Sequence, residues 1–427
     1  MLEVGIAILV FIALLLLGVP VAFSVISGTI VGLFAIGSLP MEALAQQSFS
    51  GATDYSMLAI PFFILTADLL FSGKLGGQVI GLMTRLVGRF RGGVGMTSVL
   101  TNAVFAGVSG SAVADATGLG KVLIPWTKRI GYPAQYAAAV NAASSVLGVI
   151  IPPSIPMILF AAASGASVAA VFNSGMIPGV VMAVALIFAC WFVAWRNDYP
   201  RVRAKLTTAG LIKGLLVATP AIIIPVVLIR VFLFTGTATV TEVSVLACVY
   251  AIIIRVFFYR DLSWKTFMRS AAESAGSTAV VMILIMFSAA LSWLLTIQEA
   301  PQKLAASLLS LTDNYYLIVL FLILILLVTG MFLDMAPAVL LLTPVLMPLA
   351  NEIGMNIIHL GILMVCTLAM GLYTPPVGTT LYISAGIGRV GINKVTRELL
   401  TFYALIILFV LAIAYLPQVF LIPVGAA

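Results

Sequence analysis

The chain has 427 residues, of which 63% are hydrophobic and 8% are charged, and its mean hydropathy is +1.23. Because soluble domains carry about 25% charged residues, this composition excludes a soluble globular protein and indicates an all-α polytopic membrane protein. The net charge of +7 comes from short basic loops between apolar segments, which is typical of membrane topology rather than of nucleic-acid binding. The three cysteines are scattered through apolar runs and indicate neither a disulfide framework nor a metal site.

The first predicted elements are two membrane spans between Val4 and Ile36, joined by a turn at Gly18-Val19-Pro20. This stretch is uncharged, is longer than the apolar part of a signal peptide and has no basic segment before it. We therefore interpret it as two retained spans rather than as a cleaved leader.

The next elements are a span over residues 54–72, a short helix over 75–90 and the apolar segment 92–127. Basic residues stand before and after this last segment: Arg85, Arg89, Arg91, Lys128 and Arg129. By the positive-inside rule both of its ends face the cytoplasm. With the small residues Gly107–Ser111 at its centre, it is predicted to be a re-entrant helical hairpin with its tip near Ser109.

A long span over 133–165 follows, and Gly148 and the pair Pro152-Pro153 interrupt it. Two adjacent prolines remove two backbone donors and cannot continue an α-helix. In hydrocarbon, unwound backbone is tolerated only where it is buried in protein or lines a polar cavity. The interruption therefore indicates a binding site, and a proline kink that serves only helix packing is the alternative.

Three further basic clusters set the topology of the remaining chain. They lie at 196–205, 255–269 and 389–397, and the positive-inside rule places all three in the cytoplasm. Between the first two, we predict spans at 214–234 and 237–254, joined by the uncharged turn Phe234-Thr235-Gly236-Thr237.

The second half of the chain repeats the glycine and proline pattern of the first half, 223 positions later. The segment Gly148–Pro153, for example, recurs as Gly371–Pro376. Four more pairs match without a gap: Gly107 with Gly330, Pro125 with Pro348, Gly131 with Gly354, and Gly165 with Gly388. The predicted elements of this half are a span at 272–297, a short helix at 301–311, a hairpin at 315–350 and a broken span at 356–388. Loop charge places both ends of this second hairpin outside, so the two halves are predicted to be inverted repeats. Matched interruptions of this kind mark the binding site of a transporter.

The two hairpin tips and the two broken spans carry mainly hydroxyl groups and free carbonyls. The candidates of the first half are Ser109, Gly110, Ser111, Asn141, Ser144, Ser145 and Gly148. Those of the second half are Thr329, Gly330, Asp334, Met335, Gly371, Thr374, Gly378, Thr379 and Thr380. Oxygen ligands suit a hard cation such as Na⁺, whereas a transition metal prefers His or Cys. Serine and threonine also pack helices together in membranes, so a purely structural role stays open for each single hydroxyl.

Three acidic residues lie within predicted membrane segments, where acids are costly and usually functional. Asp334 is the strongest candidate because it lies at the second hairpin tip, although it is also placed to cap the following helix. Asp115 is alternatively a structural partner of Lys121, and Asp68 is predicted to be structural. The single histidine, His359, is predicted to lie at the membrane interface.

The sequence has no P-loop, no His-Glu-x-x-His motif and no complete Gly-x-Ser-x-Gly motif, which speaks against an enzyme or an ATP-driven pump. Transport would then draw on an ion gradient. A channel, a proton-coupled antiporter with the same inverted repeats and a structural membrane protein are the competing classes. The paired interruptions favour a transporter, because polar groups gather at two tips rather than along a continuous path.

The motifs resemble the large membrane subunit of the tripartite ATP-independent periplasmic (TRAP) transporters over essentially the whole chain. In the first half they are Ala59–Phe63, Gly107–Asp115, Gly131–Pro133 and Ile151–Pro156. In the second half they are Gly330–Asp334 and Thr374–Gly378. We see no departure from the family pattern.

This resemblance implies a sodium-driven elevator transporter of the bacterial inner membrane. It implies import of an organic acid, such as a C4-dicarboxylate or sialic acid, that a periplasmic binding protein delivers. It also implies a small membrane subunit of about four helices, which we expect as a separate polypeptide.

Carried over to this chain, the family pattern implies two sodium sites and a substrate site between the hairpin tips. The first sodium site comprises Ser109, Gly110, Ser111, Asn141, Ser145 and Gly148. The second comprises Gly330, Asp334, Gly371 and Thr374. The substrate site comprises Ser111, Ser154, Asp334, Met335, Gly378 and Thr379.

The implied domain organisation alternates scaffold and repeat. Residues 1–50 form scaffold helices, 51–165 the first repeat, 166–270 connecting and scaffold helices, 271–388 the second repeat, and 389–427 a C-terminal helix. The core of the transport domain comprises 92–165 and 315–388.

Overall fold

The structure is a computed structural model that describes residues 2–71, 75–202 and 237–420, together with residues 212, 214, 216 and 219. Over these ranges every regular element is a helix. Nearly all of the predicted span 214–234 and most of the turn after it lie outside the described residues, as do Arg203, Lys205 and the end of the chain from residue 421.

The composition and length of the described helices confirm the class of polytopic membrane protein. Six of them are long and apolar enough to cross a membrane, or up to eight if each of two bent helix pairs counts as one span. Four shorter apolar helices, of 10–17 residues, accompany them.

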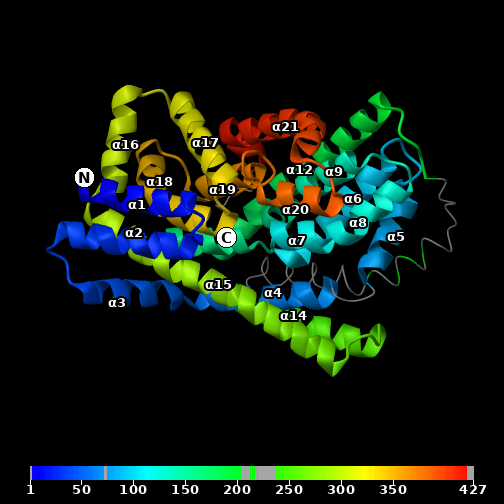
Figure 1. Cartoon of the computed structure of the whole chain (residues 1–427), viewed down its shortest axis with the longest axis horizontal. Helices are drawn as coiled ribbons and strands as arrows, with labels where there is room; N and C mark the ends of the chain where they lie inside the picture. Colours follow the sequence, from blue (N-terminus) through cyan, green and yellow to red (C-terminus); the bar gives the residue numbers. More distant parts are fainter. Residues whose placement is uncertain are drawn as a thin grey trace.

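The chain begins with two closely packed helices, α1 (Leu2–Leu16) and α2 (Val21–Ile36), as the sequence predicts. Their contact depends on glycine, because a Cβ built on Gly28 would lie 2.6 Å from the carbonyl oxygen of Ala7. The helices α3 (Met41–Ala52) and α4 (Ala59–Phe71) follow, with the short 3₁₀ helix Tyr55–Leu58 between them and a bend of 57°. The 34-residue helix α15 (Trp264–Ile297) runs along α2, α3 and α4 as one long diagonal rod (Figure 1).

At both predicted hairpins the chain forms helices on either side of a tight turn, three helices in the first half and two in the second. In the first half, α5 (Leu75–Val87) leads to α6 (Gly93–Ser109), which turns at Gly110 into α7 (Ala112–Gly118) and α8 (Gly120–Arg129). In the second half, α16 (Ala300–Leu311) leads to α17 (Tyr315–Phe332), which turns into α18 (Met335–Glu352). We call α6–α8 hairpin 1 and α17–α18 hairpin 2.

Both long spans are broken where the sequence places Gly and Pro-Pro. The first consists of α9 (Ala134–Ser145), α10 (Leu147–Ile150) and α11 (Ile155–Ser164), with a bend of 42°. The second consists of α19 (Ile357–Gly371) and α20 (Thr379–Gly388). The remaining helices surround these elements: α12 (Val168–Arg196), α14 (Val240–Ile253) with the π-helical turn Ile254–Phe258, α21 (Ile392–Tyr415) and α22 (Pro417–Phe420).

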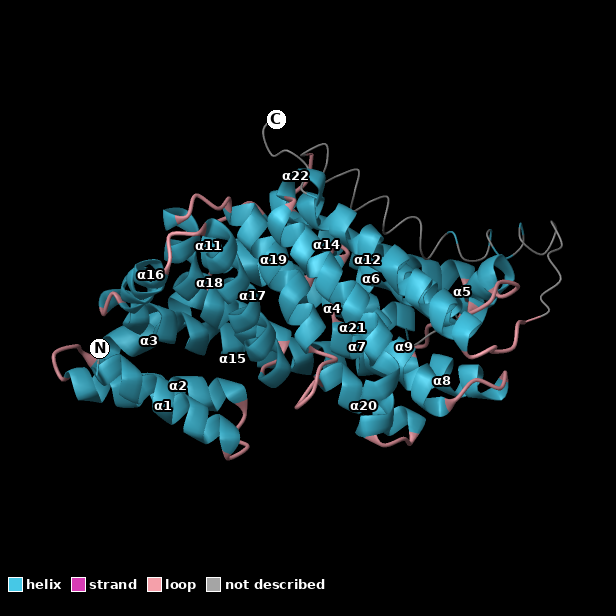
Figure 2. Cartoon of the chain, turned by 90° about the horizontal axis from the view of Figure 1, so that it is seen from above, coloured by secondary structure: helices cyan, strands magenta, loops and turns pink. Residues whose placement is uncertain are grey.

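The helix that follows each break packs against the hairpin of the other half. Helix α20 of the second half packs on α9 and on hairpin 1, while α11 of the first half packs on α18 of hairpin 2. Figure 2 shows the hairpins in different parts of the molecule, with α18 to the left and α8 to the right of α19 and α21. Each hairpin therefore packs against helices from both halves of the chain.

Two predicted surface residues are buried instead. Arg255, which we assigned to a cytoplasmic basic cluster, pairs with Asp261 at 2.9 Å, and its side chain is 3% exposed. It also donates a hydrogen bond to the carbonyl oxygen of Leu69, near the end of α4. His359, predicted at the interface, is 3% exposed and lies 3.0 Å from the carbonyl oxygen of Ile413, so it joins α19 to α21.

Candidate functional site

At hairpin 1, the tip lies directly against the first helix break. The backbone N–H of Ile155 donates a hydrogen bond of 3.3 Å to the carbonyl oxygen of Gly110. Gly110 has a positive φ of +62°, and a Cβ built on it would lie 3.1 Å from the carbonyl oxygen of Pro153. Only glycine adopts this conformation without strain at so close an approach, which explains the glycine between Ser109 and Ser111.

At hairpin 2 the tip contacts the second helix break in the same way. The backbone N–H of Gly378 donates a hydrogen bond of 3.3 Å to the carbonyl oxygen of Met331, again joining a break to a tip. A Cβ built on Gly330 would lie 2.9 Å from the carbonyl oxygen of Leu368, and one built on Gly371 would collide with the backbone of Gly330. The matched glycines of the repeat thus hold α17 against α19.

A cluster of buried oxygen atoms without hydrogen-bond partners lies beside the tip of hairpin 1. Ser109, Asp115 and Asn141 are 1%, 0% and 1% exposed. Within the described part of the chain, Ser109 Oγ, both carboxylate oxygens of Asp115 and Asn141 Oδ1 lack a partner. A Cβ built on Gly148 would collide with Asp115 Oδ2 and lie 3.1 Å from Ser109 Oγ. We call Ser109, Asp115, Asn141 and Gly148 the oxygen cluster.

The orientation of Asn141 is set by residues from both halves. Its Nδ2 donates to the carbonyl oxygen of Ala116 at 3.0 Å and to Ser384 Oγ of α20 at 2.9 Å. Nearby, Thr380 Oγ1 of α20 donates to the carbonyl oxygen of Ala142 at 3.2 Å. With its amide donors engaged, Asn141 keeps its buried Oδ1 without a partner among the described residues. The sequence could not place Ser384 here, because it comes from the other half.

The structure corrects the alternative interpretation of Asp115. Its carboxylate makes no ion pair with Lys121, which is exposed. Asp115 instead lies beside Ser109 and Gly148, two of the residues predicted for the first sodium site.

The other residues predicted for the first half have local roles. Ser145 Oγ donates to the carbonyl oxygen of Ala142 at 3.0 Å, so its hydroxyl is engaged within its own helix. Ser111 is the N-cap of α7, and Ser154 is the N-cap of α11 and donates to the carbonyl oxygen of Val149. These caps satisfy the free N–H groups at the start of each helix.

In the second half, Asp334 occupies the N-cap position of α18 without a side-chain capping hydrogen bond. Thr374 Oγ1 donates to the carbonyl oxygen of Met370 at 2.7 Å. Thr379 Oγ1 is buried without a partner among the described residues, and Met335 is 5% exposed. This half of the chain thus offers the carboxylate of Asp334, which makes no capping bond, and the unpaired hydroxyl of Thr379.

A cavity of about 410 Å³ reaches the tip of hairpin 1. It lies between hairpin 1, the start of α11 and the long helices α4 and α15. Its polar lining residues are Asp68, Ser109, Ser111, Thr117, Lys121, Glu273, Ser274 and Ser277.

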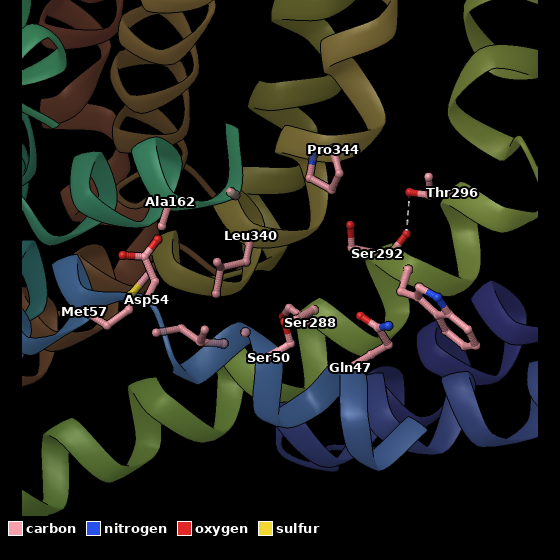
Figure 3. A pocket seen from close by; sticks show the side chains of 15 residues that line it. Gln47, Ser50, Asp54, Met57, Ala162, Ser288, Ser292, Thr296, Leu340 and Pro344 are labelled. Atoms are coloured by element: carbon pink, nitrogen blue, oxygen red, sulfur yellow. Dashed lines mark hydrogen bonds between the residues drawn. The ribbon is translucent and has the colours of Figure 1, made fainter. Parts of the chain in front are cut away.

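A second cavity, also of about 410 Å³, lies beside hairpin 2 between α3, α11, α15 and α18. Figure 3 shows Ser288, Ser292 and Thr296 on one wall and Leu340 and Pro344 on another, with Asp54 at one end. The two cavities use equivalent positions of the repeat: Ser50 and Glu273, Gly51 and Ser274, Asp54 and Ser277, Leu340 and Thr117, and Pro344 and Lys121. We call them the hairpin-1 and hairpin-2 cavities.

The fold is shared with a solved membrane transporter. It is similar to the crystal structure of the Alcanivorax borkumensis YdaH transporter, with a TM-score of 0.65 over 92% of this chain and 90% of that chain. The two sequences are 16% identical, so this likeness concerns the fold alone. Helical hairpins and broken helices in an apolar chain of this fold define the class of polytopic membrane proteins.

Residues 8–419 match the family model described as "Tripartite ATP-independent periplasmic transporter, DctM component". The chain belongs to this family, and it is a transporter permease rather than an enzyme. This confirms the family that the sequence motifs indicate.

Several curated relatives cover nearly the full chain. An uncharacterized protein of Sinorhizobium fredii is 44% identical over 96% of this chain and 98% of its own length. The 2,3-diketo-L-gulonate TRAP transporter large permease protein of Escherichia coli is 32% identical over 98% of this chain and 99% of its own. The C4-dicarboxylate TRAP transporter large permease protein of Rhodobacter capsulatus is 31% identical over 96% of both.

Two further relatives are named for other anions. The sialic acid TRAP transporter large permease protein of Vibrio cholerae is 31% identical over 96% of this chain and 95% of its own length. The isethionate TRAP transporter permease protein DctMQ of Oleidesulfovibrio alaskensis is 31% identical over 96% of this chain, which spans 64% of that longer protein.

The contact between Gly330 and Gly371 yields a test of the architecture. Gly371→Ala should lower the free energy of unfolding by about 1–3 kcal/mol, because the added methyl group collides with the backbone of α17. Thermal unfolding of the detergent-purified chain measures this change. Gly386→Ala in α20 is the matched control, since a Cβ there meets nothing within 4 Å. Equal melting temperatures for the two variants would contradict the close contact.

Proposed function

We propose that this chain is the large membrane subunit of a sodium-coupled importer of a small organic acid in the bacterial inner membrane. The observation that carries the proposal is the oxygen cluster. A buried carboxylate without a compensating charge costs several kcal/mol. The hydroxyl of Ser109 lies beside this carboxylate, and the neighbouring helix α9 carries the buried, unpaired amide oxygen of Asn141. Oxygen atoms of this kind are the ligands that a hard cation prefers, and Na⁺ would also neutralise Asp115.

In this proposal the first sodium site comprises Ser109, Asp115, Asn141 and Gly148, with Gly110 and Ser111 at the adjoining tip. The second comprises Gly330, Asp334, Gly371 and Thr374, largely through backbone carbonyls. We add Asp115 to the sodium ligands predicted from the sequence, because its buried carboxylate has no partner among the described residues. Each Na⁺ that enters down a potential of 100 mV releases about 2.3 kcal/mol. Two ions therefore supply enough for a roughly thousandfold accumulation of substrate.

We further propose that the halves are inverted repeats and that transport follows an elevator mechanism. The transport domain comprises 92–165 and 315–388, and it moves against the scaffold. The equivalent positions that line the two cavities support this, because inverted repeats place equivalent cavities on opposite sides of the membrane. The basic residues at the ends of hairpin 1 assign its cavity to the cytoplasm.

The partners in this proposal are a periplasmic substrate-binding protein and a small membrane subunit encoded as a separate chain. The family description supports the first. The length of the Oleidesulfovibrio relative, of which this chain spans 64%, supports the second.

Sodium binding should stabilise the folded chain. In rising NaCl we expect the melting temperature to increase, with about 2.7 kcal/mol of stabilisation at a hundredfold excess over Kd. Potassium and choline chloride are the ionic-strength controls. Bulky substitutions of Ser109 or Thr374 should reduce this response and abolish coupled uptake. An equal rise in melting temperature with all three salts would contradict sodium coupling and favour proton coupling at Asp115 and Asp334.

Cysteine labelling tests the inverted arrangement. Ser277→Cys in the hairpin-1 cavity should react with a membrane-impermeant maleimide only from the cytoplasmic side. Ser50→Cys in the hairpin-2 cavity should react only from the periplasmic side. The three native cysteines are buried, so the unmodified chain is the control for background labelling. Reaction of both variants from the same side would contradict the inversion.

A further inference from the structure

The charges on the walls of the hairpin-1 cavity are unequal. Lys121 is the single cation among the described lining residues, and it has no ion pair within the described ranges. The opposite wall, from α4 and α15, carries Asp68 and Glu273. Glu273 forms an ion pair with Arg269 at 2.7 Å, which compensates its charge. Within the described ranges Asp68 makes no ion pair and is attracted by Arg269 only at longer range.

The wall of this cavity that hairpin 1 and the start of α11 form is suited to binding an anion. Lys121 projects from α8, and the first turn of the 10-residue helix α11 reaches the cavity at Ile155. The N-terminal end of a helix attracts negative charge. Ser109 is 1% exposed and lines the same cavity, and its hydroxyl has no hydrogen-bond partner among the described residues. An acid group bound here would lie beside the oxygen cluster, where binding of Na⁺ would affect it directly.

The rest of the lining is suited to uncharged hydroxyl groups. Besides Ser109, the cavity presents the hydroxyls of Ser111, Thr117, Ser274 and Ser277. Asp68 can accept hydrogen bonds from a hydroxylated ligand, but it would repel a second carboxylate. The volume of about 410 Å³ lies within the range of about 300–1,000 Å³ that is usual for small-molecule pockets.

The hairpin-2 cavity does not supply the missing cation. Pro344 stands where the hairpin-1 cavity has Lys121, and Asp54 is the single charge among its described lining residues. A dicarboxylate therefore finds one unpaired cation in one cavity and none in the other.

We infer that Lys121 binds the acid group of the substrate and that the substrate is a monoanionic, hydroxyl-rich acid of the sugar-acid type rather than a dicarboxylate. This inference rests on the proposed function, since it assigns the substrate class of the same transporter. Lys121 binds the acid group by charge attraction, and Asp68 repels a second carboxylate on the same substrate.

The test is ligand-induced stabilisation of the detergent-purified full-length chain at saturating NaCl, with D-gluconate and succinate as probes. D-gluconate should raise the melting temperature at concentrations where succinate does not. Lys121→Gln should abolish the gluconate response, Lys121→Arg should keep part of it, and Lys394→Gln, at an exposed lysine of α21, should leave it unchanged. Asp68→Asn should allow succinate to stabilise the chain.

The sodium response separates this inference from the proposed function. Lys121→Gln should keep the sodium-induced rise in melting temperature, which reports that the variant is folded. Stabilisation by succinate but not by gluconate, an unchanged gluconate response in Lys121→Gln, or no response to either acid in a chain that responds to sodium each overturns the assignment. Loss of the sodium response in the unmodified chain contradicts the proposed function instead.

Discussion

The enclosed carboxylate of Asp115 constrains the whole region around hairpin 1. Removing a charged group from water is costly unless a partner of opposite charge or a set of donors replaces the water. At Asp115 the described residues supply no cation, and the neighbouring side chain of Ser109 offers a hydroxyl group. Asp115 lies on α7, and the helices α6, α9, α10 and α20 pack around α7. A site that gathers oxygen atoms and excludes water is suited to a cation, which supports the proposed sodium site.

Glycine makes that enclosure possible, because it lets backbone approach backbone at both tips. Gly148 leaves space for the oxygens of Asp115 and Ser109, and Gly371 leaves space for the backbone of Gly330. In addition, α11 packs on hairpin 2 and α20 packs on hairpin 1, so each hairpin contacts a helix of the other repeat. Movement of one hairpin would therefore disturb contacts of both halves, which agrees with the proposal that both hairpins move as one body.

Much of the architecture was predictable because its signals are local. Gly and Pro-Pro determine where a helix breaks, and small residues between apolar runs determine where a hairpin turns, so α6–α11 and α17–α20 lie close to their predicted ranges. Contacts between distant segments were not predictable. Ser384 orients Asn141 across the two halves, and Arg255 turns inward to Asp261 and Leu69. Asp115 appeared to have a partner in Lys121 because sequence spacing does not reveal which face of a helix is enclosed.

The most direct test of the account is equilibrium binding of ²²Na⁺ to the purified full-length chain. The account predicts saturable binding that excess unlabelled sodium displaces and potassium does not, with one ion at each hairpin tip. Asp115→Asn should remove the ion at hairpin 1 and leave the other, whereas Asp313→Asn, at an exposed acid, should change nothing. Absence of saturable sodium binding, or unchanged binding in Asp115→Asn, would contradict the central claim.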